Sequence, residues 1–270
     1  MYRYLPLVLL LLFSCKLAQK SPAVQDQSTA PAVAPLEHKA LAVLFVQRSA
    51  EYRALVYQTY FLAEMRLREI RARKPEQKLA VVVDIDETLL DNSPYGAWQV
   101  LNNQPYTFES WKRWTDLAAA DTVPGALRFL QVADSLEYAV FYISNRKQEE
   151  LQATMKNLQR FDFPAVNEER VLLRTTTSGK EPRREKVRRQ GYEIAMMAGD
   201  NLNDFLEDFE KKTREERNAK VDSVRNAFGN RLIVLPNPVY GEWENAMYRY
   251  QFDLSPAMQD SVRRSLLKGF

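Results

Sequence analysis

Cysteine and histidine are nearly absent from this chain of 270 residues: Cys15 is its only cysteine and His38 its only histidine. A single cysteine cannot form a disulfide within the chain, and a histidine without a second histidine or a cysteine to help it is a poor metal ligand. We therefore expect no disulfide framework, and we expect His38 to be an ordinary surface residue.

A strong charge of either sign is also missing. The 38 lysines and arginines face 35 aspartates and glutamates, so the net charge is only +3 and shows no footprint for nucleic acid. The basic stretch "RLREIRARK" ends a predicted helix, where the helix dipole explains the cations. With 46% apolar and 27% charged residues, the chain is long enough for one sizeable α/β domain, and a fibrous or wholly disordered protein is excluded.

The apolar run near the start of the chain is too short to span a membrane. In "MYRYLPLVLLLLFSC" it extends from Leu5 to Phe13, about half of the ~20 residues that a spanning helix needs. We predict a signal peptide over residues 1–14. The residues before Cys15 resemble a bacterial lipobox, in which the cysteine becomes lipid-modified, although Phe13 is unusual at its position. A plain secreted protein with an incidental cysteine is the alternative.

Residues 15–35 are predicted to tether the folded part to a membrane. The stretch "KSPAVQDQSTAPAVAP" is small, polar and rich in proline and alanine, without a helical or strand period. A lipid on Cys15 would then attach residues 36–270, which we expect to form a single domain. The expected location is the bacterial cell envelope, at the outer membrane.

The folded part begins with a helical pattern and continues as an alternation of strands and helices. Apolar residues recur at helical spacing from Leu36 to Arg73, which fits two amphipathic helices or one long bent helix. Lys78 to Asp84 shows no alternation, as in a strand buried on both faces. The patterns that follow are a helix over 124–135, a strand over 137–143, a helix over 147–159, a strand over 171–173, a helix over 182–190, a strand over 194–198, a helix starting after Asn201 and a strand over 232–235.

This alternation predicts an α/β fold with a doubly wound parallel sheet, because strands that alternate with helices form right-handed βαβ units. About forty residues rich in aromatics and turn formers separate the first strand from the helix at 124, which is too many for an ordinary connection. We expect this segment to form a cap.

Polar side chains follow several of the predicted strands, at the edge where open α/β sheets bind ligands. They are Asp84 and Asp86, then Ser144, Asn145 and Arg146, then Lys180, and finally Asp200 and Asp204. Four carboxylates in one place repel one another unless a cation lies among them, and an all-oxygen set suits Mg²⁺. A calcium loop of the EF-hand type is excluded, because Leu89 stands where that loop needs glycine.

The spacing of the first two aspartates suits phosphoryl transfer. In an extended segment alternate side chains share a side, so Asp84 and Asp86 can reach one reacting group. One carboxylate can attack phosphorus, while the other protonates the leaving oxygen and then activates water. Lys180 and Ser144 would hold the phosphoryl oxygens. A lone "DxD" is more often part of a loop or a helix cap. The prediction of phosphoryl transfer therefore depends on the other polar residues.

These residues resemble the four motifs of the haloacid dehalogenase superfamily of phosphatases: "DIDET", Ser144, Lys180 and "GDNLND". Within it, "DIDETLLDNSPYGAWQ", "QRSAEYRAL", "FYISNRK" and "LPNPVYGEW" are similar to the class C nonspecific acid phosphatases, bacterial surface lipoproteins that also act as 5′-nucleotidases. The resemblance covers residues from about 38 to the C-terminus. It implies a Rossmann-like fold, N-terminal helices and a mainly helical cap with elements at about 92–123 and 236–270.

The resemblance also implies a role for each matching residue. Asp84 would be the nucleophile and Asp86 the general acid and base. The implied phosphate-binding residues are Ser144, Asn145 and Lys180, the implied Mg²⁺ site comprises Asp84, Asp86 through its backbone carbonyl, Asp200 and Asp204, and the implied aromatic contacts to a nucleotide are Trp111 and Tyr240. Lys186, in the same basic segment, is the alternative lysine. The spacing between the motif lysine and "QGYEI" favours Lys180.

The expected function is thus an Mg²⁺-dependent phosphomonoesterase for nucleotides and other small phosphate esters. A phosphotransferase that uses the same aspartyl-phosphate stays open, as does a non-catalytic surface-binding lipoprotein on this fold. The complete set of Asp84, Asp86, Lys180 and Asp200 speaks against an inert protein. A dehalogenase is disfavoured because that reaction does not need Asp86 as a proton donor. The residues leave the oligomeric state open, including a homodimer.

Overall fold

The computed structural model describes residues 36–270, and these lie within one compact unit. The predicted signal peptide, lipid anchor at Cys15 and tether lie outside the described residues. None of the described helices combines the length and apolarity that crossing a membrane requires.

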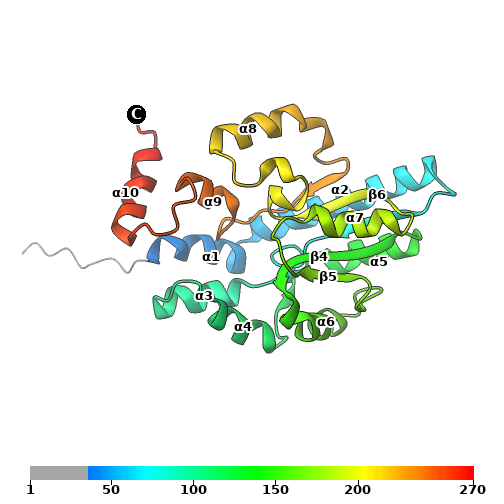
Figure 1. The fold of residues 1–270 in the computed structure, drawn as a ribbon, viewed down its shortest axis with the longest axis horizontal. Helices are drawn as coiled ribbons and strands as arrows, with labels where there is room; N and C mark the ends of the chain where they lie inside the picture. The colour runs from blue at the N-terminus through cyan, green and yellow to red at the C-terminus, as the bar shows by residue number, and fades with distance from the viewer. Residues whose placement is uncertain (1–35) are drawn as a thin grey trace, which may run out of the picture. The chain divides into compact units, whose positions relative to one another are not determined.

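A five-stranded parallel sheet forms the centre of this unit (Figure 1). Its strands are β1 (Leu79–Val83), β4 (Ala139–Lys147), β5 (Val171–Arg174), β6 (Glu193–Gly199) and β7 (Leu232–Val234). Their order across the sheet is β5-β4-β1-β6-β7, and every neighbouring pair is parallel. The chain moves from β1 to one side and then returns to the other, so the carboxyl end of β1 lies where the strand order reverses. Open α/β sheets bind ligands at such a point.

Helices cover both faces of the sheet, as expected. The α-helices of residues 36–270 are α1 (Ala40–Arg48), α2 (Ala50–Arg73), α3 (Ser93–Asn102), α4 (Phe108–Asp116), α5 (Ala126–Ser135), α6 (Leu151–Gln159), α7 (Glu181–Arg189), α8 (Arg214–Ser223), α9 (Glu242–Met247) and α10 (Pro256–Leu266). All five residues of β1 are buried. Leu79, Val81 and Val83 belong to the core cluster that includes residues of α2 and α5, whereas Ala80 and Val82 pack in a second cluster with Val187 of α7. The strand without alternation is thus buried on both faces.

The N-terminal helical segment consists of two helices and not of one long bent helix, the other alternative that its sequence left open. Ser49 is extended and caps α2, accepting a hydrogen bond from the Tyr52 amide while its hydroxyl donates to the Phe45 carbonyl at the end of α1. A serine in this position satisfies backbone groups that a helix end leaves unpaired.

Two parts of the fold differ from the expectation. The helix expected after Asn201 is replaced by two 3₁₀ turns, η3 (Leu202–Asp204) and η4 (Glu207–Phe209), and α8 begins only at Arg214. The carboxylate of Asp204 turns back to accept from the Asn201 amide and pairs with Lys180, so tertiary contacts override the helical pattern. In addition, β4 continues to Lys147 instead of ending at residue 143, because it pairs again with β5 after a register shift.

The segment expected to form a cap holds α3 and α4. It is closed by a short antiparallel ribbon of β2 (Leu90–Asp91) and β3 (Asp121–Thr122), which the sequence did not predict. The C-terminal α9 and α10 lie near α1 (Figure 1), and Lys39 just before α1 pairs with Glu244 of α9 at 3.4 Å. Residues from both ends of the folded part therefore meet beside the cap segment.

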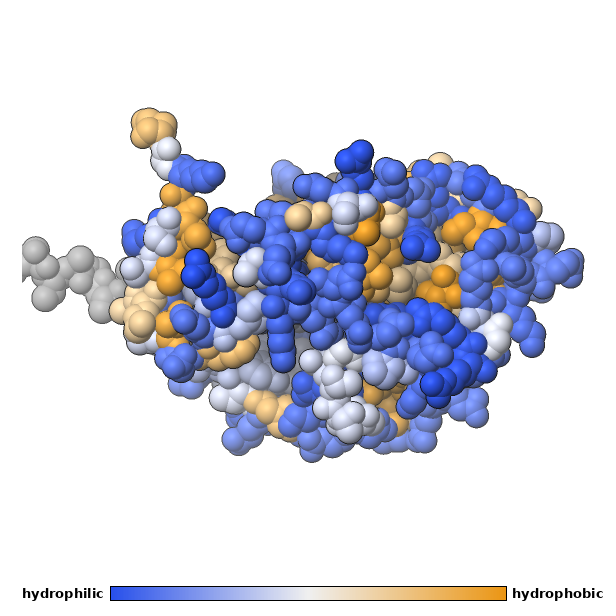
Figure 2. Space-filling model, turned by 45° about the horizontal axis from the view of Figure 1, so that its top comes forward, coloured by the Kyte–Doolittle hydropathy of each residue, from blue (hydrophilic) through white to orange (hydrophobic). Residues whose placement is uncertain are grey.

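The C-terminal helix contributes little to the core. No residue of α10 is buried. Figure 2 shows a mostly hydrophilic face with several hydrophobic patches, one of them along the C-terminal segment, whose exposed apolar side chains include Phe252, Met258 and Leu267.

Candidate active site

The end of β1 directs Asp84 into a buried ion cluster. The Asp84 amide donates to the carbonyl of Ala198 on β6 at 2.9 Å, which holds this residue in the sheet. Its Oδ1 pairs with the ammonium of Lys180, and Lys180 also pairs with Oδ1 of Asp204 at 2.7 Å. All three side chains are less than a tenth exposed. Residues from β1, from the loop before α7 and from η3 thus meet at one point.

Asp84, Asp200 and Asp204 form an acidic cluster, with one carboxylate oxygen of each lying within 4.8 Å of the others. The pKa of Asp84 is raised to about 7: burial raises it most, Lys180 lowers it, and the charges of Asp204 and Asp86 raise it. Burial, then Asp204 and Asp84, raises the pKa of Asp200 well above its ordinary value. One lysine does not neutralise three carboxylates.

This donor set fits a hard divalent cation. Oxygen ligands from three carboxylates are what Mg²⁺ prefers, and a cation would offset the repulsion among them. The amide of Asn237 donates to Asp200 Oδ2 at 2.8 Å, which orients that carboxylate. Such contacts to ligands tune metal sites. The sequence reasoning did not identify Asn237.

The carboxylate of Asp86 lies outside the acidic cluster. It accepts from Arg146 Nη2 at 2.8 Å and Nε at 3.0 Å, from Asn92 Nδ2 at 2.8 Å and from the hydroxyl of Ser144 at 3.2 Å. Arg146 is 3% exposed, and its pKa lies above the ordinary value because Asp86 more than offsets the effect of burial. The two aspartates of "DID" therefore have separate environments, and their distinct implied roles stay a prediction.

The cap segment reaches Asp86 through Asn92. The side-chain amide of Asn92 contacts both sides. Its Nδ2 donates to Asp86, and its Oδ1 accepts from the indole N–H of Trp114 on α4 at 2.8 Å. The backbone amide of Asn92 donates to Glu87, and Glu87 accepts from the hydroxyl of Tyr240. Asn92, Glu87 and Trp114 received no role from the sequence, and Arg146 was noticed only as a polar residue at a strand end.

The remaining phosphate-binding candidates are held by their neighbours. Ser144 is fully buried, and its oxygen also accepts from the Arg146 amide at 3.1 Å. Asn145 is exposed and accepts from Arg183 at 2.7 Å. Lys186 is exposed on α7, whereas Lys180 is buried. That Ser144, Asn145 and Lys180 contact a substrate phosphate stays a prediction.

Two consecutive arginines of α7 tie the loops of the site together. Arg183 donates to the carbonyls of Ser144 and Gly179 and to Asn145, whereas Arg184 donates to the carbonyl of Asp204 at 2.8 Å. Both are buried, at 6% and 1% exposure. The sequence "EPRREK" reads as a solvated basic segment, so nothing in its composition marks these two residues.

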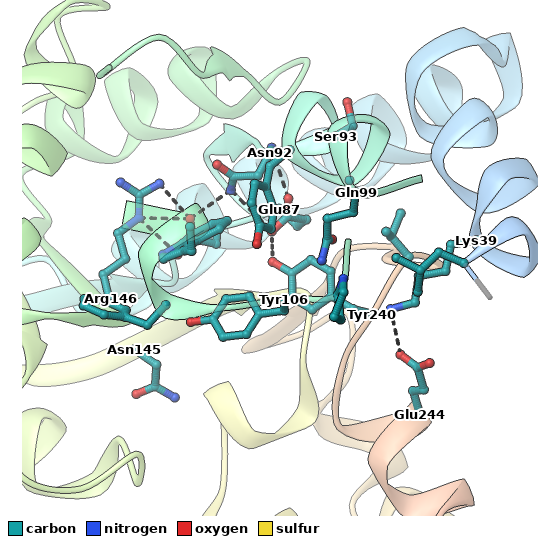
Figure 3. A pocket seen from close by; sticks show the side chains of 18 of the residues that line it. Lys39, Glu87, Asn92, Ser93, Gln99, Tyr106, Asn145, Arg146, Tyr240 and Glu244 are labelled. Atoms are coloured by element: carbon teal, nitrogen blue, oxygen red, sulfur yellow. Dashed lines mark hydrogen bonds and ion pairs between the residues drawn. The ribbon is translucent and has the colours of Figure 1, made fainter. Parts of the chain in front are cut away.

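A cavity of about 440 Å³ opens from Asp86 (Figure 3). Arg146, Asn92 and Glu87 lie at one end and the Lys39–Glu244 pair at the other, and Tyr240 lies between them. His38, exposed as expected, lies at the rim.

The two aromatic candidates differ in accessibility. Tyr240 is 38% exposed, whereas Trp111 is only 9% exposed, packed against Tyr95 with the Arg146 guanidinium 5.6 Å from its ring centroid. Trp111 therefore offers little free ring face in this structure. Tyr106, 60% exposed on the same cavity, is an aromatic that the sequence did not single out.

The close approach of Gly199 and Asp204 gives a direct test of the cluster. A Cβ on Gly199 would lie 2.4 Å from Asp204 Oδ2, so Gly199→Ala must displace that carboxylate. We expect a loss of about 1–3 kcal/mol in the free energy of unfolding and a loss of about tenfold or more in Mg²⁺ affinity. Urea unfolding and calorimetric Mg²⁺ titration measure the two.

Gly269→Ala is the matched control, because nothing lies within 4 Å of a Cβ there. If Gly199→Ala bound Mg²⁺ as the control does, Asp204 would not support the metal site.

Comparison with known proteins agrees with this geometry. The sheet order, the aspartates after the central strand and the lysine before α7 define a haloacid dehalogenase-like fold. The family model described as HAD superfamily, subfamily IIIB (acid phosphatase) matches residues 8–243. The structure of the class C acid phosphatase from Bacillus anthracis aligns with a TM-score of 0.83 at 39% identity, covering 88% of this chain and 100% of that one. The chain belongs to the class C acid phosphatases of this subfamily.

Further matches include a second crystal structure and two plant proteins. A second Bacillus anthracis crystal structure, with tungstate bound, has a TM-score of 0.82 at 39% identity and covers 87% of this chain and 98% of that one. Acid phosphatase 1 of Solanum lycopersicum is 24% identical over 166 residues, which are 59% of this chain and 57% of that protein. The stem 28 kDa glycoprotein of Glycine max is 24% identical over 202 residues, 72% of this chain and 69% of that protein. The chain thus spans little more than half of the tomato protein.

Proposed function

We propose that this protein is a phosphomonoesterase that requires a divalent cation, Mg²⁺ in the first place. The observation that carries the proposal is the buried set of Asp84, Lys180, Asp200 and Asp204 at the end of the central strand. Membership of an acid phosphatase family supports the reaction class. The tungstate in the Bacillus anthracis relative is a tetrahedral oxyanion, and its binding there agrees with a phosphate pocket in this fold.

The proposed reaction has two displacements at phosphorus. An Asp84 carboxylate oxygen attacks, the bond to the leaving oxygen breaks, and Asp86 donates its proton to that oxygen. Asp86 then removes a proton from water, whose oxygen attacks the aspartyl-phosphate and releases inorganic phosphate and free Asp84. Between turnovers Arg146, Asn92 and Ser144 hold the Asp86 carboxylate in place.

The metal would be held by the Asp84 and Asp200 side chains and the Asp86 carbonyl, with Asp204 supporting them. When bound, a divalent cation offsets the charge of the phosphoryl oxygens. Lys180 supplies a second positive charge from within the protein, and its buried pairs with Asp84 and Asp204 keep it ionised: burial lowers its pKa, but the two carboxylates raise it above the ordinary value.

The substrates we propose are nucleoside 5′-monophosphates and other small phosphate esters. A cavity of about 440 Å³ lined by Tyr106 and Tyr240 has room for a leaving group beyond the phosphate. Aromatic rings bind any base through its π-face, which suits an enzyme of broad specificity. Lipid attachment through Cys15 at the bacterial outer membrane is part of the proposal and is supported by the sequence alone.

Metal removal tests the proposal. The purified protein should hydrolyse p-nitrophenyl phosphate and adenosine 5′-monophosphate with Mg²⁺ at acidic to neutral pH. EDTA should abolish both activities, because three crowded carboxylates then lack their cation, and added Mg²⁺ should restore them. Phosphate release in a colorimetric assay measures each step.

Tungstate should inhibit both reactions. Hydrolysis that persists in EDTA would refute the metal requirement, and no hydrolysis of either ester across this pH range would refute the phosphomonoesterase.

A further inference from the structure

A pair of cations lies at the edge of the cavity, away from the ion cluster of the reaction centre. Lys147 ends β4 and Arg174 ends β5, and the two residues are directly paired in the register of these strands. Both line the cavity that opens from Asp86, together with Tyr106 and Phe108, and both also line an adjoining hollow of about 350 Å³.

Arg174 has no partner for its charge. It is partly buried, yet within residues 36–270 no carboxylate or other acceptor lies within hydrogen-bonding or ion-pairing distance of its guanidinium. Its positive charge lowers a Tyr106 pKa that burial raises, which places the guanidinium near that hydroxyl. A guanidinium has five N–H donors, and burying part of it without an acceptor is unfavourable.

Lys147 is only weakly paired. Its ammonium lies 3.2 Å from the centroid of the Phe108 ring at the start of α4, and 3.8 Å from Glu149 Oε1. Its side chain is 40% exposed, and ion pairs of that exposure and length contribute little. The ammonium is therefore available to a ligand at the cavity rim.

The carboxylates that line this end of the cavity are already engaged. Glu150 is buried and accepts from the Thr115 hydroxyl at 2.9 Å and from the Lys147 amide at 2.7 Å. Asp86 is held by the Arg146 guanidinium. Neither carboxylate contacts the guanidinium of Arg174 or the ammonium of Lys147, so within residues 36–270 Arg174 lacks a counter-charge and Lys147 has only the exposed Glu149 at 3.8 Å.

We propose that Arg174 and Lys147 bind a second phosphate group, carried by the leaving group of the substrate. The site would then favour bisphosphate esters over monophosphate esters, an inference that rests on the proposed phosphomonoesterase. Arginine with lysine matches a dianion, because the planar guanidinium presents two N–H groups to phosphate oxygens. The exposed hydroxyls of Thr175 and Thr176 line the adjoining hollow and add donors.

The position of the pair suits a distant second phosphate and not the reacting one. In the sheet order β5-β4-β1, Arg174 lies two strands from the end of β1, and two strand spacings are about 10 Å. A sugar or nucleoside phosphorylated at two positions can bridge such a span. A single phosphate at Asp84 cannot contact both places.

Matched substrate pairs test this proposal. The pairs are adenosine 5′-monophosphate with adenosine 3′,5′-bisphosphate, and fructose 6-phosphate with fructose 1,6-bisphosphate. We expect kcat/KM to be about tenfold or more higher for the bisphosphate of a pair, the effect of one or two hydrogen bonds to a charged group. If only the nucleoside pair showed the preference, the preferred substrates would be nucleoside bisphosphates. If both pairs showed it, they would be bisphosphate esters in general.

Variants connect the preference to the residues. Arg174→Gln should bring the bisphosphate-to-monophosphate ratio close to one, and Lys147→Gln should lower it in part. Lys186→Gln removes the same charge from the exposed face of α7 and should leave the ratio as in the wild type. A wild-type ratio near one in both pairs, or an unchanged ratio in Arg174→Gln, would overturn the subsite.

Binding to Asp84→Asn separates this proposal from the proposed function. Calorimetric affinities of the same ligands give the ratio without turnover. If no ester were hydrolysed but the bisphosphate still bound more tightly through Arg174, the phosphomonoesterase would fail and the anion subsite would stand. Equal affinities would refute the subsite whether or not the protein is an enzyme.

Discussion

Asp84→Asn should lower kcat for every phosphomonoester by about 10⁴-fold or more, the scale of losing a nucleophile. Asparagine keeps the shape of the side chain, but its neutral amide is a poor nucleophile towards phosphorus and a poorer metal ligand. Lys180 keeps its ion pair with Asp204 at 2.7 Å, so the buried ammonium is not left unpaired and the variant should fold. Initial rates with p-nitrophenyl phosphate, together with the melting temperature, measure both expectations.

The control for this substitution is Asp222→Asn. Asp222 is exposed on α8, so the same chemical change there should leave kcat unaltered. A variant at Asp84 that folds and keeps full activity would show that the nucleophile is another residue.

The second large effect should depend on the leaving group. On the proposed mechanism, Asp86→Asn removes the proton donor, which typically contributes 10²–10⁴-fold. We expect a loss of about that size for alkyl esters such as glycerol phosphate. For p-nitrophenyl phosphate the first displacement needs little protonation, so a burst of p-nitrophenol should precede slow turnover, because the aspartyl-phosphate then lacks its general base. Rapid-mixing absorbance and acid-quenched phosphoprotein measure the two steps.

The Mg²⁺ affinity of Asp86→Asn is a separate test of the role of Asp86. The Asp86 carboxylate is not part of the cluster formed by Asp84, Asp200 and Asp204, so Mg²⁺ affinity should stay near that of the wild type. Arg146 loses its carboxylate partner in the variant and keeps Thr154 at 3.1 Å, so we expect about 1–3 kcal/mol lower stability. Absence of a p-nitrophenol burst, or a lost metal site, would contradict the assignment of Asp86.

The environment of Asp86 connects the cap segment to the reaction centre. Trp114 on α4 donates to Asn92, and Asn92 donates to Asp86, so one side chain of the cap segment reaches the proposed proton donor through a single residue. Arg146 holds the same carboxylate from β4. The Asp86 carboxylate is therefore oriented from the cap segment and from β4 at once.

The sequence alone determined the sheet and the place of the chemistry. Unbroken apolar runs such as 79–83 are buried on both faces, and strands that alternate with helices must be parallel, so polar residues after each strand meet at one edge. The same reasoning predicts that Asp84, Lys180 and Asp204 lie together, and in the structure Lys180 pairs with both carboxylates.

The tertiary structure decided which side chains face inward and which partners they find. Arg183 and Arg184 belong to the same basic run as Arg188 and Arg189, yet only the first two are buried, because α7 packs against β4 and β6 and leaves carbonyls there to be satisfied. Likewise, a local pattern could not show that Asp204 would cap its own turn and end the expected helix.

The lining of the cavity likewise could be known only from the tertiary structure. Nothing in the sequence distinguishes the buried ring of Trp111 from the exposed ring of Tyr106, or shows that Arg174 would be left without a counter-charge beside Lys147. Periodicity and strand order depend on neighbours along the chain, which the sequence contains. Partners and exposure depend on residues brought together from distant segments, and only the folded chain specifies those distances.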